Sequence, residues 1–237
     1  PICLRVYSGA NVSFKNEVDL ESFASAIGVA AQTAFDGNVR LGANSSIVAS
    51  TTSFSFGESA SMSGSGLIIC STVTPSATLQ KQLKKADWAG TLELRSKSST
   101  ALMKFSGMDL NNWGNSGSGV ILNGVTGYFV DPGNGGTTNI LLKTIEIGQN
   151  GLSLTNDVYS SRTYNIESTL KGSGAIKLET QTGNKTYSKY VFTGDVSEFA
   201  GSIDFGALSA NRPIVVFANK DEQIPAASDY GQIIFTS

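Results

Sequence analysis

The chain repeats one pair of short motifs at two places far apart in the sequence. Residues 64–69 read GSGLII, and residues 88–94 continue with WAGTLEL. Residues 172–178 read GSGAIKL, and residues 199–205 continue with FAGSIDF. In both copies a corner of small residues leads into an apolar strand, and an aromatic-Ala-Gly triplet leads into another. A unit this small cannot bury its apolar face alone, so it must stack on a neighbouring unit, which is the principle of a solenoid.

Apolar and polar residues alternate in short segments along the whole chain. TLELR at 91–95, AIKLE at 175–179 and SFSF at 53–56 each place their apolar side chains on one face. Period-2 alternation predicts half-buried β-strands, and the Gly, Asn and Ser residues that border these segments predict turns. Charged residues make up 15% of the chain, against about 25% in ordinary globular proteins. An all-β fold with uncharged polar surfaces follows.

The repeats and the alternation together predict one elongated, right-handed parallel β-helix, a β-solenoid, that forms a single domain over residues 1–237. Turns of about 20 residues would stack at the strand spacing of about 4.8 Å. A two-sheet β-sandwich or jelly roll is the alternative, because it also uses many short alternating strands. The chain starts with PICLR, without a signal peptide, and ends on the strand-like QIIFTS. We therefore expect it to be a piece of a longer secreted protein.

Two segments have helical rather than strand periodicity. The first follows Asp19, a residue suited to an N-cap, and places five apolar residues on one helical face: Leu20, Phe23, Ala24, Ile27 and Ala31. Gly28 weakens this helix. The second segment spans 76–86, with Ser76 as its N-cap and with Leu79 and Leu83 one helical turn apart. It predicts a single short amphipathic insertion.

The chain contains no histidine, and this absence excludes several kinds of chemistry. Ser-His-Asp and Cys-His catalysis, His-ligated zinc or iron and imidazole pH switches all need that side chain. No GxxxxGK[ST] loop occurs, and the glycine-rich segment 133–136 follows Asp131 and Pro132 as a surface turn does. The net charge is −2 and the basic residues are scattered, so the sequence has no basic patch of the kind that binds nucleic acid. We expect no cofactor, metal or nucleotide, and no nucleic-acid partner.

The two cysteines, Cys3 and Cys70, are too few for a disulfide scaffold and have no CxxC partner for zinc. We interpret them as free thiols in strands, with a disulfide that closes the long loop between them as the alternative.

Several of the repeats resemble a known family of strand repeats. Residues 172–178, GSGAIKL, and 192–203, FTGDVSEFAGSI, are similar to the autotransporter-associated β-strand repeats of bacterial secreted passenger domains. Those repeats have a glycine-rich lead, G-x-G-x-L-x-L, followed by an F-x-G-x-I element. Looser matches at 88–92 and 119–129 extend the resemblance over residues 35–206, although the repeat spacing here is irregular. The resemblance implies a parallel β-helix, export to the cell surface and a role in adhesion or surface coating.

Aromatic and amide side chains are the candidates for ligand binding, because rings stack on sugars and amides hydrogen-bond to sugar hydroxyls. Trp113 lies between Asn112 and Asn115 in the loop NNWGNS at 111–116, and Tyr128 is a further aromatic candidate. These four residues are the predicted binding residues. Trp88 is a weaker candidate, since it occupies the repeat position of a phenylalanine and suits a packing corner.

Carboxylates offer the one remaining route to catalysis, as in glycoside hydrolysis. Asp195, Glu198 and Asp204 form the densest group of acids. Asp195 suits a turn after Gly194, and the other two alternate with apolar residues as outward-facing side chains do. A structural role is the stronger interpretation, and we assign no catalytic residue.

We expect this chain to be a structural and adhesive surface module of an autotransporter-like passenger, and not an enzyme. It would bind a host or community surface glycan or protein through repeated weak polar and aromatic contacts. It would be secreted or held at the bacterial cell surface, as part of a longer membrane-anchored chain. Two alternatives stay open: a polysaccharide-acting β-helix enzyme that uses carboxylates, and a carbohydrate-binding module.

The residue inventory predicts that stability does not depend on a metal. No segment offers the four N or S ligands of structural zinc or the D-x-[DN]-x-[DN]-G spacing of a calcium loop. EDTA should therefore leave the thermal unfolding midpoint unchanged. A fall of more than about 5 °C that Ca²⁺ reverses would contradict this expectation and direct attention to Asp195, Glu198 and Asp204.

Overall fold

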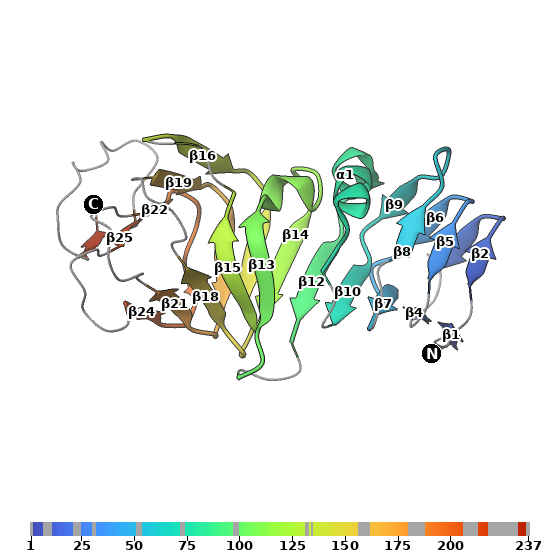
Figure 1. Ribbon diagram of the computed structural model, residues 1–237, viewed down its shortest axis with the longest axis horizontal. Helices are drawn as coiled ribbons and strands as arrows, with labels where there is room; N and C mark the ends of the chain where they lie inside the picture. The colour runs from blue at the N-terminus through green and yellow to red at the C-terminus, as the bar shows by residue number, and fades with distance from the viewer. Residues whose placement is uncertain are drawn as a thin grey trace.

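The computed structural model is a β-solenoid, in which the chain winds in successive turns and each turn adds parallel strands to those of the turn before (Figure 1). This confirms the predicted fold class and excludes the sandwich, while the right hand of the winding stays a prediction. The model describes residues 2–6, 11–20, 25–29, 32–50, 54–71, 74–96, 100–130, 133, 135–155, 162–179, 188–205, 213–217 and 232–235.

Sheet A extends through nearly the whole described chain and takes one strand from each turn. Its nine strands, in spatial order, are β1 (Ile2–Val6), β4 (Ser25–Val29), β7 (Ser46–Ala49), β10 (Leu67–Ser71), β12 (Thr91–Arg95), β14 (Gly119–Asn123), β17 (Thr144–Ile147), β20 (Thr169–Gly172) and β23 (Glu198–Phe199). Spatial order follows chain order, so each turn lies directly on the one before it.

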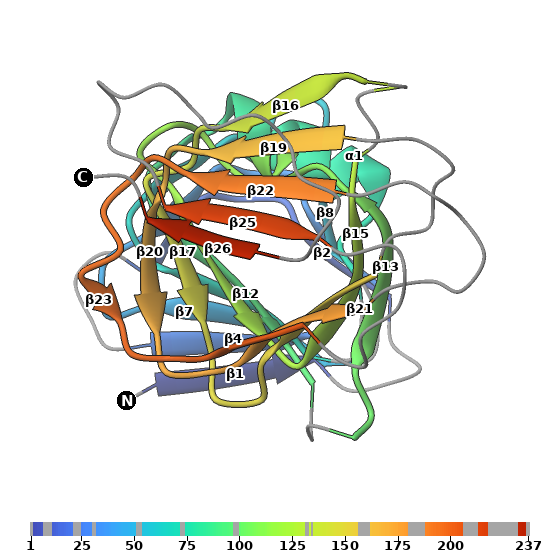
Figure 2. The ribbon, with the colours of Figure 1, turned by 90° about the vertical axis from the view of Figure 1, so that its left-hand side faces the viewer.

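The other two sides of the solenoid change sheets near the middle of the chain. In the first half, sheet B consists of β2 (Val12–Phe14), β5 (Thr33–Phe35) and β8 (Phe54–Phe56), and sheet C of β3 (Val18–Leu20), β6 (Val39–Leu41), β9 (Met62–Gly64) and β11 (Asp87–Trp88). In the second half, sheet D consists of β13 (Met103–Met108), β15 (Val125–Phe129), β18 (Leu152–Thr155), β21 (Ile176–Glu179) and β24 (Ile203–Asp204). Sheet E consists of β16 (Thr137–Ile140), β19 (Arg162–Ile166), β22 (Ser188–Phe192), β25 (Ile214–Phe217) and β26 (Gln232–Phe235). Figure 2 looks along the solenoid from its C-terminal side and shows the strands of sheet E stacked along one side.

All strand pairs in the described part are parallel and in register, with one irregularity between β13 and β15. In sheet B, Phe14 aligns with Phe35 and Phe35 with Phe56. The rings of Phe14 and Phe35 stack with centroids 5.1 Å apart, and those of Phe35 and Phe56 lie 5.9 Å apart. Register therefore turns each inward-facing position into a column of similar side chains inside the solenoid.

Turn length is not constant along the solenoid, and the turn of about 20 residues expected from the sequence holds only for the early turns. Ala26 aligns with Ser46 of the next turn, whereas Thr91 aligns with Gly119, so the later of these two turns is distinctly longer. The longer turns add loops at the corners and leave the register of sheet A unchanged. This variation explains why the sequence repeats are irregularly spaced.

The predicted insertion is confirmed, and the other predicted helix is wrong. Helix α1 (Ala77–Lys85) has Ser76 as its N-cap, with Oγ accepting from Leu79 N at 3.1 Å, and both Leu79 and Leu83 are buried. The segment from 19 to 31 instead forms the end of β3 and strand β4, apart from 21–24, 30 and 31, which lie outside the described residues. Stacking explains the error, because Leu20 aligns with Leu41 and Ile27 aligns with Ile47. No helix in the described part is long and apolar enough to cross a membrane.

The aromatic-Ala-Gly motif has a local steric reason. The ring of Trp88 lies over Gly90, and its Nε1 donates to Gly66 O at 3.1 Å, so a Cβ on Gly90 would meet both the ring and that carbonyl at about 2 Å. The ring of Phe199 covers Gly201 in the same way. Trp88 precedes a strand of sheet A, whereas Phe199 precedes a strand of sheet D. The motif therefore makes a tight corner and is not tied to one side of the solenoid.

Cys70 is a free, buried thiol, and burial raises its pKa to about 12. Through successive strands of sheet A, Cys3 aligns with Ala26, Ser46 and Leu67, and Leu67 precedes Cys70 in the same strand. The backbones at the two cysteines are thus three turns apart, about 14 Å, which exceeds the reach of a disulfide. The interpretation of Cys70 as a free thiol is confirmed.

Burial follows the predicted alternation in β21 of sheet D, whereas in β12 of sheet A Glu93, between two leucines, is also buried and pairs with Arg95 at 2.6 Å. Leu92, Leu94, Ile176 and Leu178 are buried, Ile203 and Phe205 are partly buried against the same core, and Lys177 between two of them is exposed. A smaller apolar cluster of Val191, Ile214 and Val216 lies on the outer face of sheet E, since these residues alternate with inward-facing ones.

Truncation of two adjacent residues in β21, one buried and one exposed, tests this burial pattern. Leu178→Ala should lower the free energy of unfolding by about 2–5 kcal/mol, because it leaves a cavity in a packed column. Lys177→Ala should lower it by less than about 1 kcal/mol, because the side chain is exposed. Urea unfolding measures both, and equal losses would show that the alternation is not a burial pattern.

Candidate functional site

A groove of about 590 Å³ lies on the outside of sheet B and runs across three successive turns. One edge is a row of outward-facing side chains that are in register, Ser13, Ala34 and Ser55. The other edge contains Asn11 and Gln32, which precede β2 and β5. We call this the sheet B groove. It runs along the solenoid axis because its edges are built from equivalent positions of successive turns.

The helix α1 closes one end of the groove. It occupies the place in its turn that a strand of sheet B would take, between β10 and β11 (Figure 1). Its N-cap residue Ser76 is a lining residue. Within the described residues the groove spans β2, β5 and β8 and ends at α1.

Side chains, not backbone groups, offer the hydrogen bonds in this groove. Strand β5 pairs with β2 on one side and with β8 on the other, so the ladders use its backbone donors and acceptors. The polar side chains among the described lining residues include the amides of Asn11 and Gln32 and the hydroxyls of Ser55 and Ser76. Amides and hydroxyls both donate and accept, which suits a ligand that is rich in hydroxyl groups.

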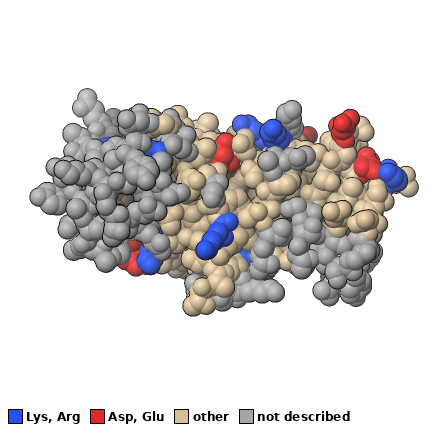
Figure 3. All heavy atoms as spheres, in the orientation of Figure 1, with Lys and Arg blue, Asp and Glu red and all other residues tan. Residues whose placement is uncertain are grey.

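The described residues that line the groove are uncharged, and Asp36, which follows β5, is already paired. Asp36 lies 2.5 Å from Lys15 Nζ and also accepts from Ser13 Oγ. The hydrogen bond from Lys15, and then that from Ser13, lowers the pKa of Asp36. On the face drawn in Figure 3, charged side chains are sparse and of both signs. The surroundings therefore favour a neutral ligand.

A smaller hollow of about 360 Å³ lies beside the predicted loop 111–116. Asn111, Asn115 and Ser116 line it, together with Lys84 of α1 and the half-exposed Leu141. Trp113 does not line it. The indole is completely buried and packs on Phe105 at 5.0 Å, so neither ring face is open to a sugar in this structure.

The amides that the sequence offered to a ligand bind other parts of the chain. Asn115 Nδ2 donates to Ala86 O at 3.1 Å and to Trp88 O at 3.0 Å. Asn112 Nδ2 donates to Asp109, and its Oδ1 accepts from Lys84 Nζ at 2.9 Å. Tyr128 lies half-buried on the outer face of β15 and is not a lining residue of this hollow. The structure thus brings Asn112, Trp113 and Asn115 together in one loop, where they fix successive turns to one another.

Three side-chain amides take the place of a neighbouring strand where the sheets change. Gln82 of α1 accepts from Phe56 N at 3.2 Å and donates to Phe56 O at 2.7 Å, at the last strand of sheet B. Asn115 meets the last strand of sheet C through Trp88 O. Asn111 donates to Asn139 O at 2.6 Å and accepts from Leu141 N at 2.8 Å, at the first strand of sheet E. An amide carries the same donor and acceptor as a peptide group, so it satisfies an edge that has no strand beside it.

The three acids do not converge on one groove. Asp195 accepts from Ser197 N at 2.8 Å, and this backbone hydrogen bond lowers its pKa. Glu198 lies in sheet A, beside Lys171 of the preceding turn, whereas Asp204 lies in sheet D, beside Lys177. Sheets A and D face outward in different directions, so these carboxylates are placed as turn and surface residues. Within the described residues, no three His, Cys, Asp or Glu side chains gather where they could hold a metal ion.

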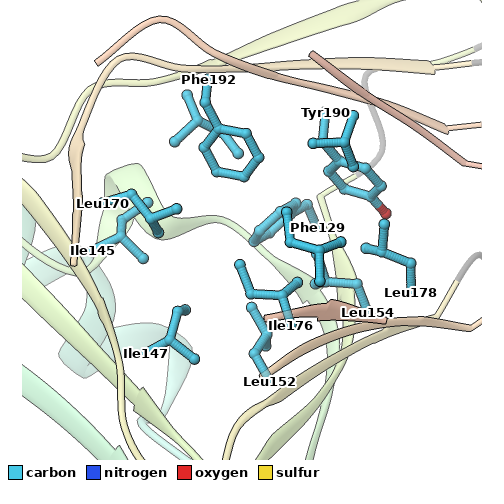
Figure 4. A pocket seen from close by; sticks show the side chains of 13 residues that line it. Phe129, Ile145, Ile147, Leu152, Leu154, Leu170, Ile176, Leu178, Tyr190 and Phe192 are labelled. Carbon is cyan, nitrogen blue, oxygen red and sulfur yellow. The ribbon is translucent and has the colours of Figure 1, made fainter. Parts of the chain in front are cut away.

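The interior of the second half is apolar and nearly filled. Figure 4 shows aliphatic and aromatic side chains from sheets A, D and E pointing toward one gap, whose volume is about 20 Å³. Tyr190 is stacked on Tyr164 at 5.4 Å in this interior, and burial raises the pKa of Tyr190. The gap has the size of one water molecule and no polar lining, so it is not a ligand site.

The chain matches no family model, no curated protein and no solved structure. The site is therefore interpreted from its own geometry.

The sequence contains a signal for the sheet B groove that the motif search missed. Residues 13–20 read SFKNEVDL and residues 34–41 read AFDGNVRL, and Phe14, Phe35 and Phe56 recur at equal intervals. The equal spacing of these phenylalanines places them at the same position of successive turns. The residue before each phenylalanine faces outward, so Ser13, Ala34 and Ser55 form one row.

Replacement of Gln82 tests whether a side-chain amide stabilises the edge of sheet B. Gln82→Glu keeps an acceptor for Phe56 N but removes the donor to Phe56 O and sets a carboxylate against that carbonyl. The free energy of unfolding at pH 7 should fall by about 1–3 kcal/mol. The carbonyl should raise the pKa of the new glutamate in the folded state, so the loss should shrink as pH falls through that raised pKa and the acid regains a proton to donate.

The control for this change is Lys81→Gln, one residue earlier on the exposed side of α1. It should change the free energy of unfolding by less than about 0.5 kcal/mol. A loss in Gln82→Glu no larger than in the control, in urea titrations at pH 7, would show that the amide does not support the edge of sheet B.

Proposed function

We propose that this chain is a structural and adhesive module of an exported bacterial surface protein. It holds a host or community surface glycan or protein by contacts that recur at equivalent positions of successive turns. The module works outside the cell, as part of a longer membrane-anchored chain, and it performs no catalysis.

One observation supports this proposal most strongly: uncharged polar residues form rows on the outside of the solenoid. In sheet E, Asn139 aligns with Asn165 of the next turn, and Asn165 Nδ2 donates to Asn139 Oδ1 at 2.9 Å. In sheet A, Thr144 aligns with Thr169 of the next turn, and both are half-exposed. Each row presents the same chemistry at intervals of about 4.8 Å.

Repetition turns weak contacts into useful affinity. A single amide or hydroxyl contact with a ligand contributes only about 0.5–1.5 kcal/mol. Several such contacts on one rigid body, and several copies of the body on one surface, raise the overall avidity by orders of magnitude without a deep pocket. The sheet B groove and the hollow beside the loop 111–116 both lie open on outer faces, consistent with this mode of binding.

Adhesion under flow tests the proposal. Beads coated with the chain should be retained on panels of immobilised glycans and glycoproteins at least about 100-fold longer than the single soluble chain. Beads coated with an unrelated β-solenoid of similar charge serve as the control. Retention equal to that of the control on every surface, or release of shortened polysaccharide by the soluble chain, would contradict an adhesive module.

A further inference from the structure

We propose that the sheet B groove binds an unbranched, neutral polysaccharide that lies along the solenoid axis, with one sugar unit on each turn. This inference rests on the proposed function and names the class of ligand for one site. It concerns residues that the motif-based candidates did not include.

The direction of the groove indicates how the ligand lies. Its edges are rows in register, Ser13, Ala34 and Ser55 on one side and Asn11 and Gln32 on the other. The two rows are two residues apart along each strand, about 7 Å. A ligand that contacts both rows on several turns must cross the strands. An extended sugar chain can lie over the rows in this direction, because one hexopyranose unit advances by about the spacing of one turn.

The hydrogen-bonding groups of the groove indicate a ligand that is rich in hydroxyl groups. The ladders with β2 and β8 use the backbone of β5, so an extended peptide cannot add to the sheet at this face. The amides of Asn11 and Gln32 and the hydroxyls of Ser55 and Ser76 are among the side chains that line the groove. Each of these groups pairs equally well with a sugar hydroxyl as donor or as acceptor. This chemistry favours a polyhydroxylated ligand over a protein partner.

The charge distribution around the groove favours a neutral ligand over an acidic one. None of the described residues that line the groove is charged, and Lys15 already pairs with Asp36, two residues after Ala34. Among these lining residues an acidic polysaccharide would find no cation to pair with its carboxylates. A neutral chain meets no such penalty, because it brings no charge to desolvate.

The length of the groove sets the size of the ligand. The groove covers β2, β5 and β8 and ends at Ser76, where α1 replaces the next strand. Affinity should therefore rise with each added sugar as the ligand comes to cover these three strands.

The experiment is affinity electrophoresis of the full chain in gels that contain soluble neutral polysaccharides, namely a β-1,4-glucan derivative, a xylan and a mannan. Gels with polygalacturonate test the acidic class. At least one neutral polymer should retard the chain, and polygalacturonate should not. Calorimetry with oligosaccharides of two to six units from the retarding polymer then measures the dependence on length.

Two variants locate the site. Ala34→Trp places an indole in the middle of the groove and should weaken binding at least tenfold. Gln32→Ala removes an exposed amide with little effect on stability and should weaken binding about threefold to tenfold. The matched control is Ser63→Trp, an equally half-exposed, outward position in β9 of the neighbouring sheet C, which should leave binding unchanged. Thermal unfolding checks that each variant is folded.

Several results would overturn the groove as a neutral-polysaccharide site. These are no retardation by any neutral polymer, stronger retardation by polygalacturonate, an affinity that does not depend on oligosaccharide length, or equal effects of Ala34→Trp and Ser63→Trp. If the coated beads still adhere under flow in any of these cases, the adhesive function stands and only this site is wrong. If neutral polysaccharide is bound through the groove but the beads do not adhere, the groove is a polysaccharide site and the adhesive function is wrong.

Discussion

Parallel, in-register hydrogen bonding between successive turns is the interaction on which the rest of this structure depends. Register makes each position of a turn a member of a column, and columns must therefore be chemically compatible from turn to turn. Inside, Phe14, Phe35 and Phe56 form such a column. Outside, opposite charges meet at adjacent turns, as Glu146 and Lys171 do at 3.3 Å. The rows that define the sheet B groove are a direct result of the same constraint.

The middle of the solenoid shows how such a stack changes shape without leaving open edges. Sheets B and C end there, and sheets D and E begin. A helix and side-chain amides fill the places where strands are missing: Gln82 at the end of sheet B, Asn115 at the end of sheet C and Asn111 at the start of sheet E. Sheet A continues through the change, so the two halves share one backbone ladder. The loop 111–116 is rich in amides because its role is to satisfy these edges.

The fold was largely predictable from the sequence, and the site was not. Alternation in segments such as TLELR and the repeated glycine corners predicted stacked strands, because both patterns depend on local chemistry. The helix predicted after Asp19 was wrong because Leu20 and Ile27 are members of different columns, and columns are set by contacts with the next turn of the chain. Trp113 was a reasonable sugar platform by composition, yet it fills the core at the change of sheets. Whether an aromatic ring faces inward or outward depends on the register of neighbouring turns, which a local motif does not contain.

Oxidative cross-linking of paired cysteines tests the register at the groove most directly. In a Cys3→Ser, Cys70→Ala background, cysteines at positions 34 and 55 lie side by side on adjacent strands, within the reach of a disulfide. Cysteines at 13 and 55 lie two turns apart, about 10 Å, and lie beyond that reach. The account predicts rapid and nearly complete cross-linking of Ala34→Cys with Ser55→Cys, and little of Ser13→Cys with Ser55→Cys. Equal rates for both pairs, or a faster reaction of the 13–55 pair, would contradict the in-register stack and the groove built on it.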